Sequence, residues 1–355
     1  MVAVCDSIFN RYLTGLPESR LLQTYSHLFM SKSSSGEPTV TLCFLTTEKN
    51  YGYPFNLVDG DFGIDFVKYG DCNSSLSSDH YIVTQSNSSL PESFWKDVKL
   101  DANIQQLLRE KMSHKSQQEI DVIGHAYKLS ASGFIEMKKD LSSQSVITQQ
   151  DPGYYTNLYS SHVRKCASDS ESYFTNNPVV IVNQDAHMVS LEMSYSYHDY
   201  KPVIASTFLV GSNNSAVIDI VTKNIELVLT EAKNEVPISD VSKKICANNL
   251  ELLHKSNIIV LAEGVDLNSI SHLSSYFCSS HMVQPIDDSS LGTKLSSNMV
   301  VSFDVSVYIP SESTIAKVSE NKMTLQSKGF GNVIYKDTFL ITESTAQRFL
   351  DVSLI

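Results

Sequence analysis

Two groups of side chains in this sequence have the types and spacing that acid–base or metal chemistry needs. His198 and Asp199 are adjacent in a polar turn, and Glu251 lies three positions before His254. A carboxylate and an imidazole are the groups that general acid–base catalysis uses most often. On a turn or on one helix, such pairs are typical of solvated surface groups, and we interpret both pairs in this way.

The motifs of several other enzyme classes are absent from the sequence. It contains no Gly-x-Ser-x-Gly elbow, no Gly-x-x-x-x-Gly-Lys phosphate loop and no Gly-x-Gly-x-x-Gly dinucleotide loop. Six cysteines occur without Cys-x-x-Cys spacing, namely Cys5, Cys43, Cys72, Cys166, Cys246 and Cys278. This scatter argues against a zinc ribbon and against a disulfide framework, and it favours a reducing compartment.

Composition and charge restrict the class of protein and of partner. Of 355 residues, 42% are hydrophobic and 19% charged, which is typical of a soluble globular protein with a sizeable core. No run approaches the ~18 apolar residues of a membrane span, and Asp6 and Arg11 interrupt the start of the chain, so we expect no leader.

The formal net charge is −12. Because nucleic-acid affinity comes mostly from Lys and Arg, we expect no direct nucleic-acid binding. The acidic balance suits a basic partner, or serves only to keep the chain in solution.

The elements that must position any site fall into two lobes, with a boundary near Ser113. Residues 1–112 are predicted to form a small α/β lobe by their apolar spacing and β-branched content. Its expected elements are a helix at Phe9–Leu28, strands at Thr39–Leu45 and His80–Thr84, loops over Tyr51–Asp71, and a helix that opens at Ser89–Trp95.

The larger lobe, residues 113–355, opens on a long helix. Ser116 and Glu119 have the spacing of a capping box, in which the hydroxyl and the carboxylate satisfy free backbone N–H groups. Apolar residues then recur near a 3.6-residue period at Ile120, Ile123, Ala126, Leu129, Phe134, Met137 and Leu141. Further elements are expected at Pro178–Val182 (strand), Leu191–Val210 (hairpin), Ala216–Lys233 and Ser239–His254 (helices, the second capped by Ser239), and Ile258–Ala262, Met299–Ile309 and Asn332–Thr342 (strands).

Three short motifs of this lobe follow one another in a familiar order. They are Lys115, Glu119 and Ile120 at the helix start, Tyr200 and Thr207 in the hairpin, and Tyr335-Lys-Asp-Thr-Phe-Leu-Ile-Thr342 near the end. In order and spacing they resemble the pita-bread metallopeptidases, which include methionine aminopeptidase, aminopeptidase P, prolidase and creatinase. The resemblance implies an α/β fold of two lobes, a small creatinase-like lobe followed by a pita-bread lobe.

The resemblance also implies where five metal ligands would stand: two aspartates, a histidine and two glutamates. These positions fall on Glu192, Val203, the segment Ser274–Ser280 around Tyr276, Asp304 and Lys336, and His281 lies nearby but out of frame.

Several of these positions lack the chemistry of a ligand. Val203 has no lone pair to give to a metal, and the ammonium of Lys336 repels a cation. A site that loses several ligands loses its metal. We therefore expect a protein that is not an enzyme, with no catalytic residues, no metal ligands and no cofactor.

Among catalytically silent relatives, two further segments are similar to the amino-terminal domain family of the large subunit of the FACT histone chaperone. They are Leu295–Phe303, whose family counterpart is Leu-Lys-Lys-Gly-Met-Val-Phe-Ser-Ile, and Ser89–Trp95. This resemblance implies a histone-binding module that acts on nucleosomes in the nucleus during transcription and replication. Its implied partners are core histones, through weak contacts, and the smaller FACT subunit, through regions outside this sequence.

No residue of the sequence identifies the histone contact. Three alternatives stay open: another silent pita-bread interaction module, a purely structural lobe, and an active metallo-aminopeptidase.

Overall fold

The chain divides into two compact units, Met1–Met112 and Ser113–Ile355. In the first unit the computed structural model describes the backbone of its strands, and in the second it describes residues 113–143, 157, 161, 179–183, 188–197, 200–209, 215–283, 294–309, 315, 317, 319–325 and 331–350. No helix in these parts of the chain is long and apolar enough to cross a membrane.

The first unit contains a six-stranded sheet in the order β4-β3-β2-β1-β5-β6. Its strands are β1 (Val2–Val4), β2 (Ser26–Lys32), β3 (Pro38–Phe44), β4 (Ile64–Lys68), β5 (Tyr81–Val83) and β6 (Lys99–Leu100). The antiparallel β1–β2–β3 core is extended on both sides by parallel strands. The strands predicted at Thr39–Leu45 and His80–Thr84 are thereby confirmed as β3 and β5.

Two expectations for this unit need correction. The helix predicted over Phe9–Leu28 was wrong at its end, because β2 begins at Ser26 and pairs with both β1 and β3. The loop predicted over Tyr51–Asp71 contains β4, whose Ile64 and Phe66 pair with Val40 and Leu42 of β3. Surrounding Gly and Asp hid this alternation of apolar residues, which only pairing with β3 makes a strand. The remainder of the predicted helix and Ser89–Trp95 lie outside the described residues.

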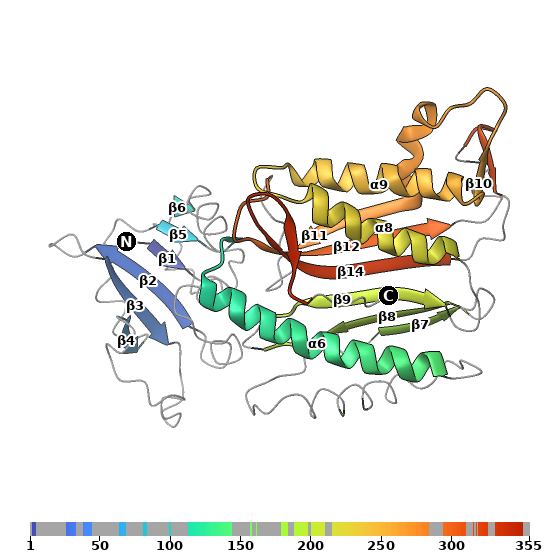
Figure 1. The fold of residues 1–355 in the computed structure, drawn as a ribbon. Coiled ribbons are helices and arrows are strands. Elements are labelled where there is room, and N and C mark those ends of the chain that lie inside the picture. Colours follow the sequence, from blue (N-terminus) through green and yellow to red (C-terminus); the bar gives the residue numbers. More distant parts are fainter. Residues whose placement is uncertain are drawn as a thin grey trace. The chain divides into compact units, whose positions relative to one another are not determined.

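The second unit is built on an antiparallel sheet in the order β11-β12-β14-β9-β8-β7, with β15 paired to β14. Its strands are β7 (Val179–Asn183), β8 (Met188–Ser194), β9 (Val203–Leu209), β11 (Cys278–Val283), β12 (Val300–Ile309), β14 (Gly331–Ile341) and β15 (Ala346–Arg348). Figure 1 shows the long helices on one face of this sheet: α6 (Gln117–Ser143) over β8 and β9, and α8 (Ser215–Glu231) and α9 (Ile238–Lys255) over β11, β12 and β14. The opposite face is called the open face below.

Short elements complete the unit. Beside α9 lie β10 (Ile259–Leu261) paired with β13 (Met323–Leu325), the 3-10 helix η1 (Asn268–Leu273) and the single turn α10 (Ser274–Phe277). Of the elements predicted for this lobe, all the strands and helices are present within a few residues of their expected bounds. β11, β13 and β15 were not predicted.

The long helix α6 begins as its sequence predicts. Ser116 N donates to Glu119 Oε2 at 2.8 Å and Glu119 N donates to Ser116 Oγ at 3.2 Å, so the capping box is confirmed. The other carboxylate oxygen of Glu119 accepts a hydrogen bond of 2.8 Å from the hydroxyl of Tyr200. The helix start and the hairpin turn, two of the motifs singled out above, are therefore joined by one glutamate.

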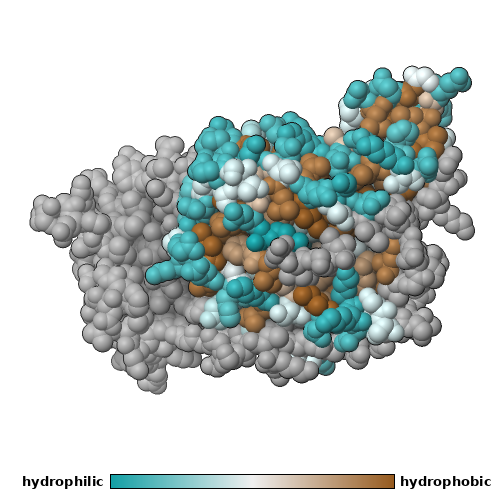
Figure 2. All heavy atoms as spheres, in the orientation of Figure 1, coloured by the Kyte–Doolittle hydropathy of each residue, from teal (hydrophilic) through white to brown (hydrophobic). Residues whose placement is uncertain are grey.

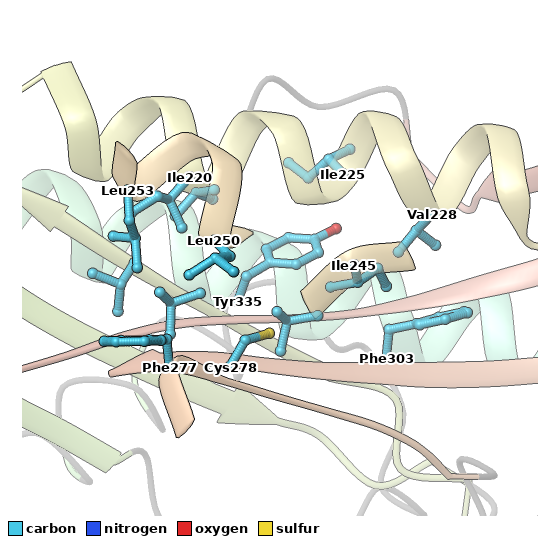
Figure 3. Close-up of a cluster of buried hydrophobic side chains, with 14 of the residues drawn as sticks. Ile220, Ile225, Val228, Ile245, Leu250, Leu253, Phe277, Cys278, Phe303 and Tyr335 are labelled. Atoms are coloured by element: carbon cyan, nitrogen blue, oxygen red, sulfur yellow. The ribbon is translucent and has the colours of Figure 1, made fainter. Parts of the chain in front are cut away.

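The larger core lies between α8, α9 and the sheet. Figure 3 shows Ile220, Ile225 and Val228 of α8 and Ile245, Leu250 and Leu253 of α9 directed toward Phe303 and Tyr335. All the apolar positions predicted for α9, namely Val241, Ile245, Leu250 and Leu253, are buried. The predicted cap was wrong: α9 begins after Pro237, and Ser239 lies in its first turn without capping it. Proline can precede the helix because it lacks the N–H group that would need a partner.

The outer faces of α8 and α9 are polar, as amphipathic helices require. Figure 2 shows many hydrophilic residues on this face, with apolar patches between them and on the projection at the upper right that carries β10. Surface ion pairs lie along both helices, including Lys223 with Glu226 and Lys243 with Asp240. The helical face is thus a solvated surface.

The two halves of the sheet meet at a short seam between β9 and β14. Only two residue pairs join these strands, Tyr335 with Ser206 and Lys336 with Ala205. Beyond each end of this short ladder, a threonine hydroxyl takes the place of a backbone group. Thr207 Oγ1 accepts a bond of 2.9 Å from Ile334 N, and Thr338 Oγ1 accepts one of 3.1 Å from Val203 N.

Candidate functional site

Four of the five positions singled out for metal ligation, Glu192, Val203, Asp304 and Lys336, lie together on the open face. Directly paired residues of an antiparallel sheet point to the same side, and the register pairs Glu192 with Ala205, Ala205 with Lys336, Lys336 with Asp304, and Asp304 with His281. These five residues form one row across β8, β9, β14, β12 and β11, called the cross-strand row below. Tyr335 and Ser206, one residue away from the row, point instead toward the helices.

Lys336 occupies the centre of the cross-strand row. Its Nζ lies 2.7 Å from Asp304 Oδ2 and 3.0 Å from Glu192 Oε2. Asp304 is on the neighbouring strand, but Glu192 is two strands away, and the small side chain of Ala205 stands between them. A larger residue at 205 would block the path of the lysine. The ammonium therefore joins carboxylates from both halves of the sheet.

The environment of Lys336 favours its charged form. Its side chain is 22% exposed, and those of Glu192 and Asp304 are 30% and 34% exposed. Burial lowers the pKa of Lys336, but the hydrogen bonds and negative charges of Asp304 and Glu192 outweigh burial, so the pKa is raised above its ordinary value. The lysine is a permanent cation at neutral pH.

Val203 also lies on the open face, two residues before Ala205 on the same strand. Its side chain is half-buried, and its backbone N–H and C=O both bond to the hydroxyl of Thr338, at 3.1 and 3.3 Å. That hydroxyl is also 2.8 Å from Ser302 Oγ. At the position expected for an aspartate, the structure therefore has an aliphatic side chain. The hydroxyl groups beside it, of Thr338 and Ser302, already hydrogen-bond to each other.

The segment expected to supply a histidine has a different structure from the turn that the resemblance implies. Tyr276 is an exposed residue of α10, and β11 starts directly after this turn. His281, which was out of frame in the sequence, is placed opposite Asp304 by the pairing of β11 with β12. It is therefore in the cross-strand row, a position that the sequence motif alone did not give it.

This set of side chains does not fit a pair of divalent cations. Hard cations need several oxygen or nitrogen ligands, whereas Val203 offers none and the ammonium of Lys336 lies where both carboxylates converge. Within the ranges that the structure describes, no three His, Cys, Asp or Glu side chains come together as metal ligands.

The two acid–base pairs noted at the outset do not form sites among the described residues. Glu251 pairs with Lys255 on α9, and His254 Nδ1 lies 3.3 Å from the carbonyl oxygen of Ile259. The interpretation as a surface group is consistent with the contact of Glu251, whereas His254 is half-buried against the backbone of β10. His198 and Asp199 lie outside the described residues.

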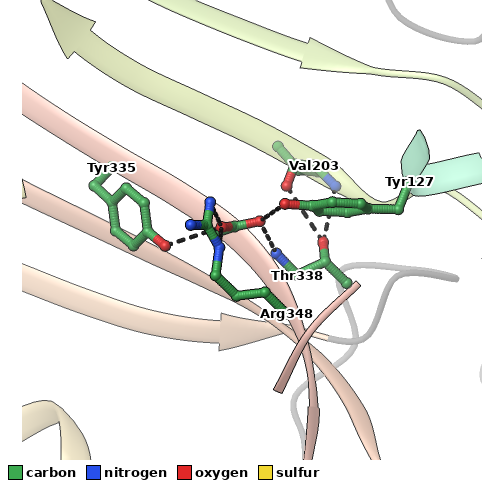
Figure 4. A network of polar contacts seen from close by, with 6 residues as sticks. Tyr127, Val203, Tyr335, Thr338 and Arg348 are labelled. Carbon is green, nitrogen blue, oxygen red and sulfur yellow. Dashed lines mark hydrogen bonds and ion pairs between the residues drawn. The ribbon is translucent and has the colours of Figure 1, made fainter. Parts of the chain in front are cut away.

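On the helical side of the same strands lies a buried polar network that sequence reasoning missed (Figure 4). Asp337 Oδ1 accepts hydrogen bonds from Tyr127 Oη at 2.6 Å and Thr338 N at 2.8 Å. Asp337 Oδ2 accepts from Tyr335 Oη at 3.1 Å and Arg348 Nε at 2.9 Å, and Arg348 Nη2 lies 2.8 Å away. The Asp-Thr pair within Tyr335–Thr342 was the signal for this network, although its partners come from α6 and β15.

In this network, burial and the contacts with its partners shift the pKa of Asp337 in opposite directions. Burial raises the pKa of Asp337, while the charge of Arg348 and the hydrogen bonds lower it, and the net direction is upward. Burial, together with the charge of Asp337, raises the pKa of Tyr127 and of Tyr335, so both phenols stay protonated and donate. The network fixes α6 and β15 to the centre of β14 and leaves the carboxylate with no free side for a substrate. Its role is structural.

Comparisons with known proteins agree with this architecture. Aminopeptidase PepP from Pseudomonas aeruginosa superposes with a TM-score of 0.71 at 15% identity, covering 97% of this chain and 85% of its own. Zinc-substituted aminopeptidase P from E. coli in complex with product gives 0.70 at 16% identity, covering 99% and 86%. Prolidase from Pyrococcus furiosus gives 0.64 at 16% identity, covering 99% and 96%. At these identities the similarity concerns the fold alone.

The sequence itself identifies the family. No match was found among curated proteins, but residues 101–343 match the model of metallopeptidase family M24. The predicted resemblance to pita-bread peptidases, of the aminopeptidase P and prolidase kind, is confirmed together with the mixed α/β fold. Because the match extends over more than half of its length, this chain belongs to metallopeptidase family M24.

Proposed function

We propose that this M24 chain is a non-catalytic, histone-binding module of a FACT-type histone chaperone. The proposal that the chain is non-catalytic rests on the position of Lys336, whose ammonium bridges Glu192 and Asp304 at 3.0 and 2.7 Å. An internal cation thus pairs with two carboxylates that a metallopeptidase would present to its metals. A metal-activated water, the nucleophile of such an enzyme, has no ligand set to hold it.

Retention of the scaffold around this altered centre supports a binding role. Glu119 with Tyr200, Thr207 with Ile334 N, and Asp337 with its donors all hold the pita-bread frame together. Folds persist while the chemistry of their sites changes, so a stable frame without peptidase ligands can serve as an interaction surface.

One local feature supports the more specific FACT-type assignment. In Leu295–Phe303, the position of the family's glycine is taken by Asn298, whose φ is 66°. This left-handed conformation favours glycine, and asparagine is among the few other residues that adopt it readily. The turn before β12 therefore has a backbone conformation that a glycine at this position would also favour.

The net charge of −12 gives the physical basis for a basic partner. Histones are strongly cationic, and complementary charge accelerates association and selects partners. Screening by salt weakens such contacts, because the Debye length falls from about 10 Å at 0.1 M to about 3 Å at 1 M. We place the protein in the nucleus, acting on chromatin, with the smaller FACT subunit bound through regions outside this sequence.

A pull-down with each of the two kinds of core-histone pair, at about 0.1 M and about 0.5 M salt, tests histone binding. We expect capture of at least one pair at the lower salt and strong loss at the higher salt. A basic protein that is not a histone, matched in charge and size, is the control. Equal capture of the control, or no capture of either histone pair at the lower salt, contradicts the proposal.

A separate assay tests the non-catalytic part. The purified chain is incubated with Mn²⁺, Co²⁺ or Zn²⁺ and with a dipeptide that ends in proline, and an active prolidase is the positive control. We expect no hydrolysis above the metal-only background. Turnover by the wild type that disappears with EDTA and in Asp304→Ala would instead support the metallo-aminopeptidase alternative.

A further inference from the structure

Two cysteines from separate elements meet between α9 and the edge strand β11. The thiol of Cys246 on α9 donates to the backbone carbonyl of Cys278 on β11, with Sγ and O 3.3 Å apart. Asn249, one turn further along α9, directs its Nδ2 at the sulfur of Cys278 from 3.5 Å. Figure 3 shows the Cys278 thiol directed into the core, near Ile245 and Leu250.

The two side chains differ in their access to solvent. Cys278 is 4% exposed, whereas Cys246 is only half-buried, and both are free thiols. A small oxidant therefore reaches Cys246 first, and Cys278 stands directly behind it. This is the arrangement of a peroxide-sensitive thiol with a resolving partner.

We propose that Cys246 and Cys278 form an oxidation site, in which a peroxide converts the two thiols into a disulfide between α9 and β11. The other four cysteines in the sequence have no assigned role in this reaction.

The pKa shifts of the two thiols support the order in which they react. A hydrogen bond from the Cys278 thiol lowers the pKa of Cys246, although burial acts in the opposite direction. The same hydrogen bond and burial raise the pKa of Cys278. Because the thiolate is the reactive form, Cys246 is the thiol that attacks the oxidant.

The reaction balances with hydrogen peroxide as the oxidant. The Cys246 thiolate attacks one peroxide oxygen, the O–O bond breaks, and hydroxide leaves and takes up the proton that Cys246 had released, which gives a sulfenic acid and one water. Cys278 then loses its proton as its sulfur attacks the Cys246 sulfur, and the hydroxyl group leaves with that proton as a second water. Two thiols are oxidised and one peroxide is reduced to two waters.

The disulfide would tie an edge strand to the helix that covers it. Among the described strands β11 is at the edge of the sheet and pairs with β12, and its His281 belongs to the cross-strand row. Cross-linking residues 246 and 278 closes a loop that contains β10, η1 and α10. Closure of such a loop restricts the unfolded chain, so the oxidised protein should resist unfolding more than the reduced one.

The test is mild treatment of the full chain with hydrogen peroxide, followed by alkylation of the remaining thiols and tryptic digestion without reductant. Cleavage after Lys244, Lys255 and Lys294 places each cysteine in its own peptide, 245–255 and 256–294. We expect these two peptides to be joined, to separate on reduction with dithiothreitol, and to be accompanied by a higher melting temperature before reduction.

Three variants make the result specific. Cys246→Ser and Cys278→Ser should each abolish the joined peptides and the rise in melting temperature, and Cys166→Ser should leave both unchanged. In Cys278→Ser, a sulfenic-acid probe should label Cys246. Oxidation of Cys246 to a sulfinic acid in the wild type without a joined peptide, or a disulfide to a different cysteine, would overturn the proposal.

Discussion

The Nζ atom of Lys336 lies 2.7 Å from Oδ2 of Asp304, at directly paired positions of β14 and β12. The resemblance to pita-bread peptidases implies that these are the positions of two acidic metal ligands. With lysine at position 336, the ammonium there supplies the counter-charge for the carboxylate of Asp304. The bridge extends to Glu192 through the gap above Ala205 and joins both halves of the sheet. The ammonium of Lys336 thus links carboxylates from both halves of the sheet at its centre.

Replacing this cation should destabilise the protein. In Lys336→Met the length and apolar stem remain, but Glu192 and Asp304 lose their shared partner. We expect a loss of about 1–2 kcal/mol in the free energy of unfolding, between the values for exposed and buried ion pairs. The matched control is Lys294→Met, because Lys294 pairs with Glu235 while 57% exposed, and should cost no more than about 0.5 kcal/mol. Urea denaturation followed by circular dichroism measures both changes, and equal effects of the two variants would contradict a special role for Lys336.

The contribution of Lys336 should also depend on pH in one direction. Its pKa is raised in the folded chain, so the folded state binds the proton more tightly than the unfolded state does. The stabilisation is therefore complete below the ordinary lysine pKa of about 10.4 and is lost as pH rises through the higher folded value. We expect the stability difference between the wild type and Lys336→Met to be constant from about pH 7 to 9 and to shrink above about pH 10.4. A difference that grows above that pH would contradict the assigned ion pairs.

Reversing the charge at the centre should create metal affinity. In the double variant Val203→Asp, Lys336→Glu, two carboxylates join Glu192 and Asp304 on the open face, and like charges in one place destabilise the fold until a cation neutralises them. We expect a lower melting temperature without metal and a higher one with Mn²⁺. At a Mn²⁺ concentration of 100 times the dissociation constant, the free energy of unfolding should rise by about 2.7 kcal/mol. Calorimetric titration of Mn²⁺ should show binding to the double variant and none to the wild type. The single variant Val203→Asp, which keeps the ammonium, is the control and should bind at least tenfold more weakly.

The buried network around Asp337 should contribute to the stability of the fold and should not affect histone binding. Tyr127→Phe removes a hydrogen bond of 2.6 Å to a buried carboxylate, and bonds to charged groups contribute about 1.5–3 kcal/mol. Tyr308→Phe is the control, since Tyr308 is exposed on β12, and should change stability by less than about 0.5 kcal/mol. Thermal unfolding of both variants compares them. Histone capture should be the same for Tyr127→Phe and the wild type at temperatures where both are folded.

The sequence by itself determined the elements whose physical signals are local. The capping box at Ser116 and Glu119 and the apolar period that follows predict α6, because both act within a few residues along the chain. The motif spacing identified the family frame, and the residue types at Val203 and Lys336 gave the chemical argument against a metal, since a methyl group and an ammonium cannot be ligands in any fold.

Tertiary structure decided everything that depends on pairing between distant strands. The register of β8, β9, β14 and β12 lets Lys336 reach Glu192 across Ala205. Pairing with β12 made β11 a strand and set His281 opposite Asp304, although Cys278–Val283 has only a weak strand pattern.

The same holds for the contacts between elements. Tyr127 and Asp337 are 210 positions apart, and Cys246 meets Cys278 only because α9 packs on β11. Local propensity acts over one or two turns of chain, whereas these contacts depend on how whole elements pack. Composition and motif spacing therefore do not predict these contacts.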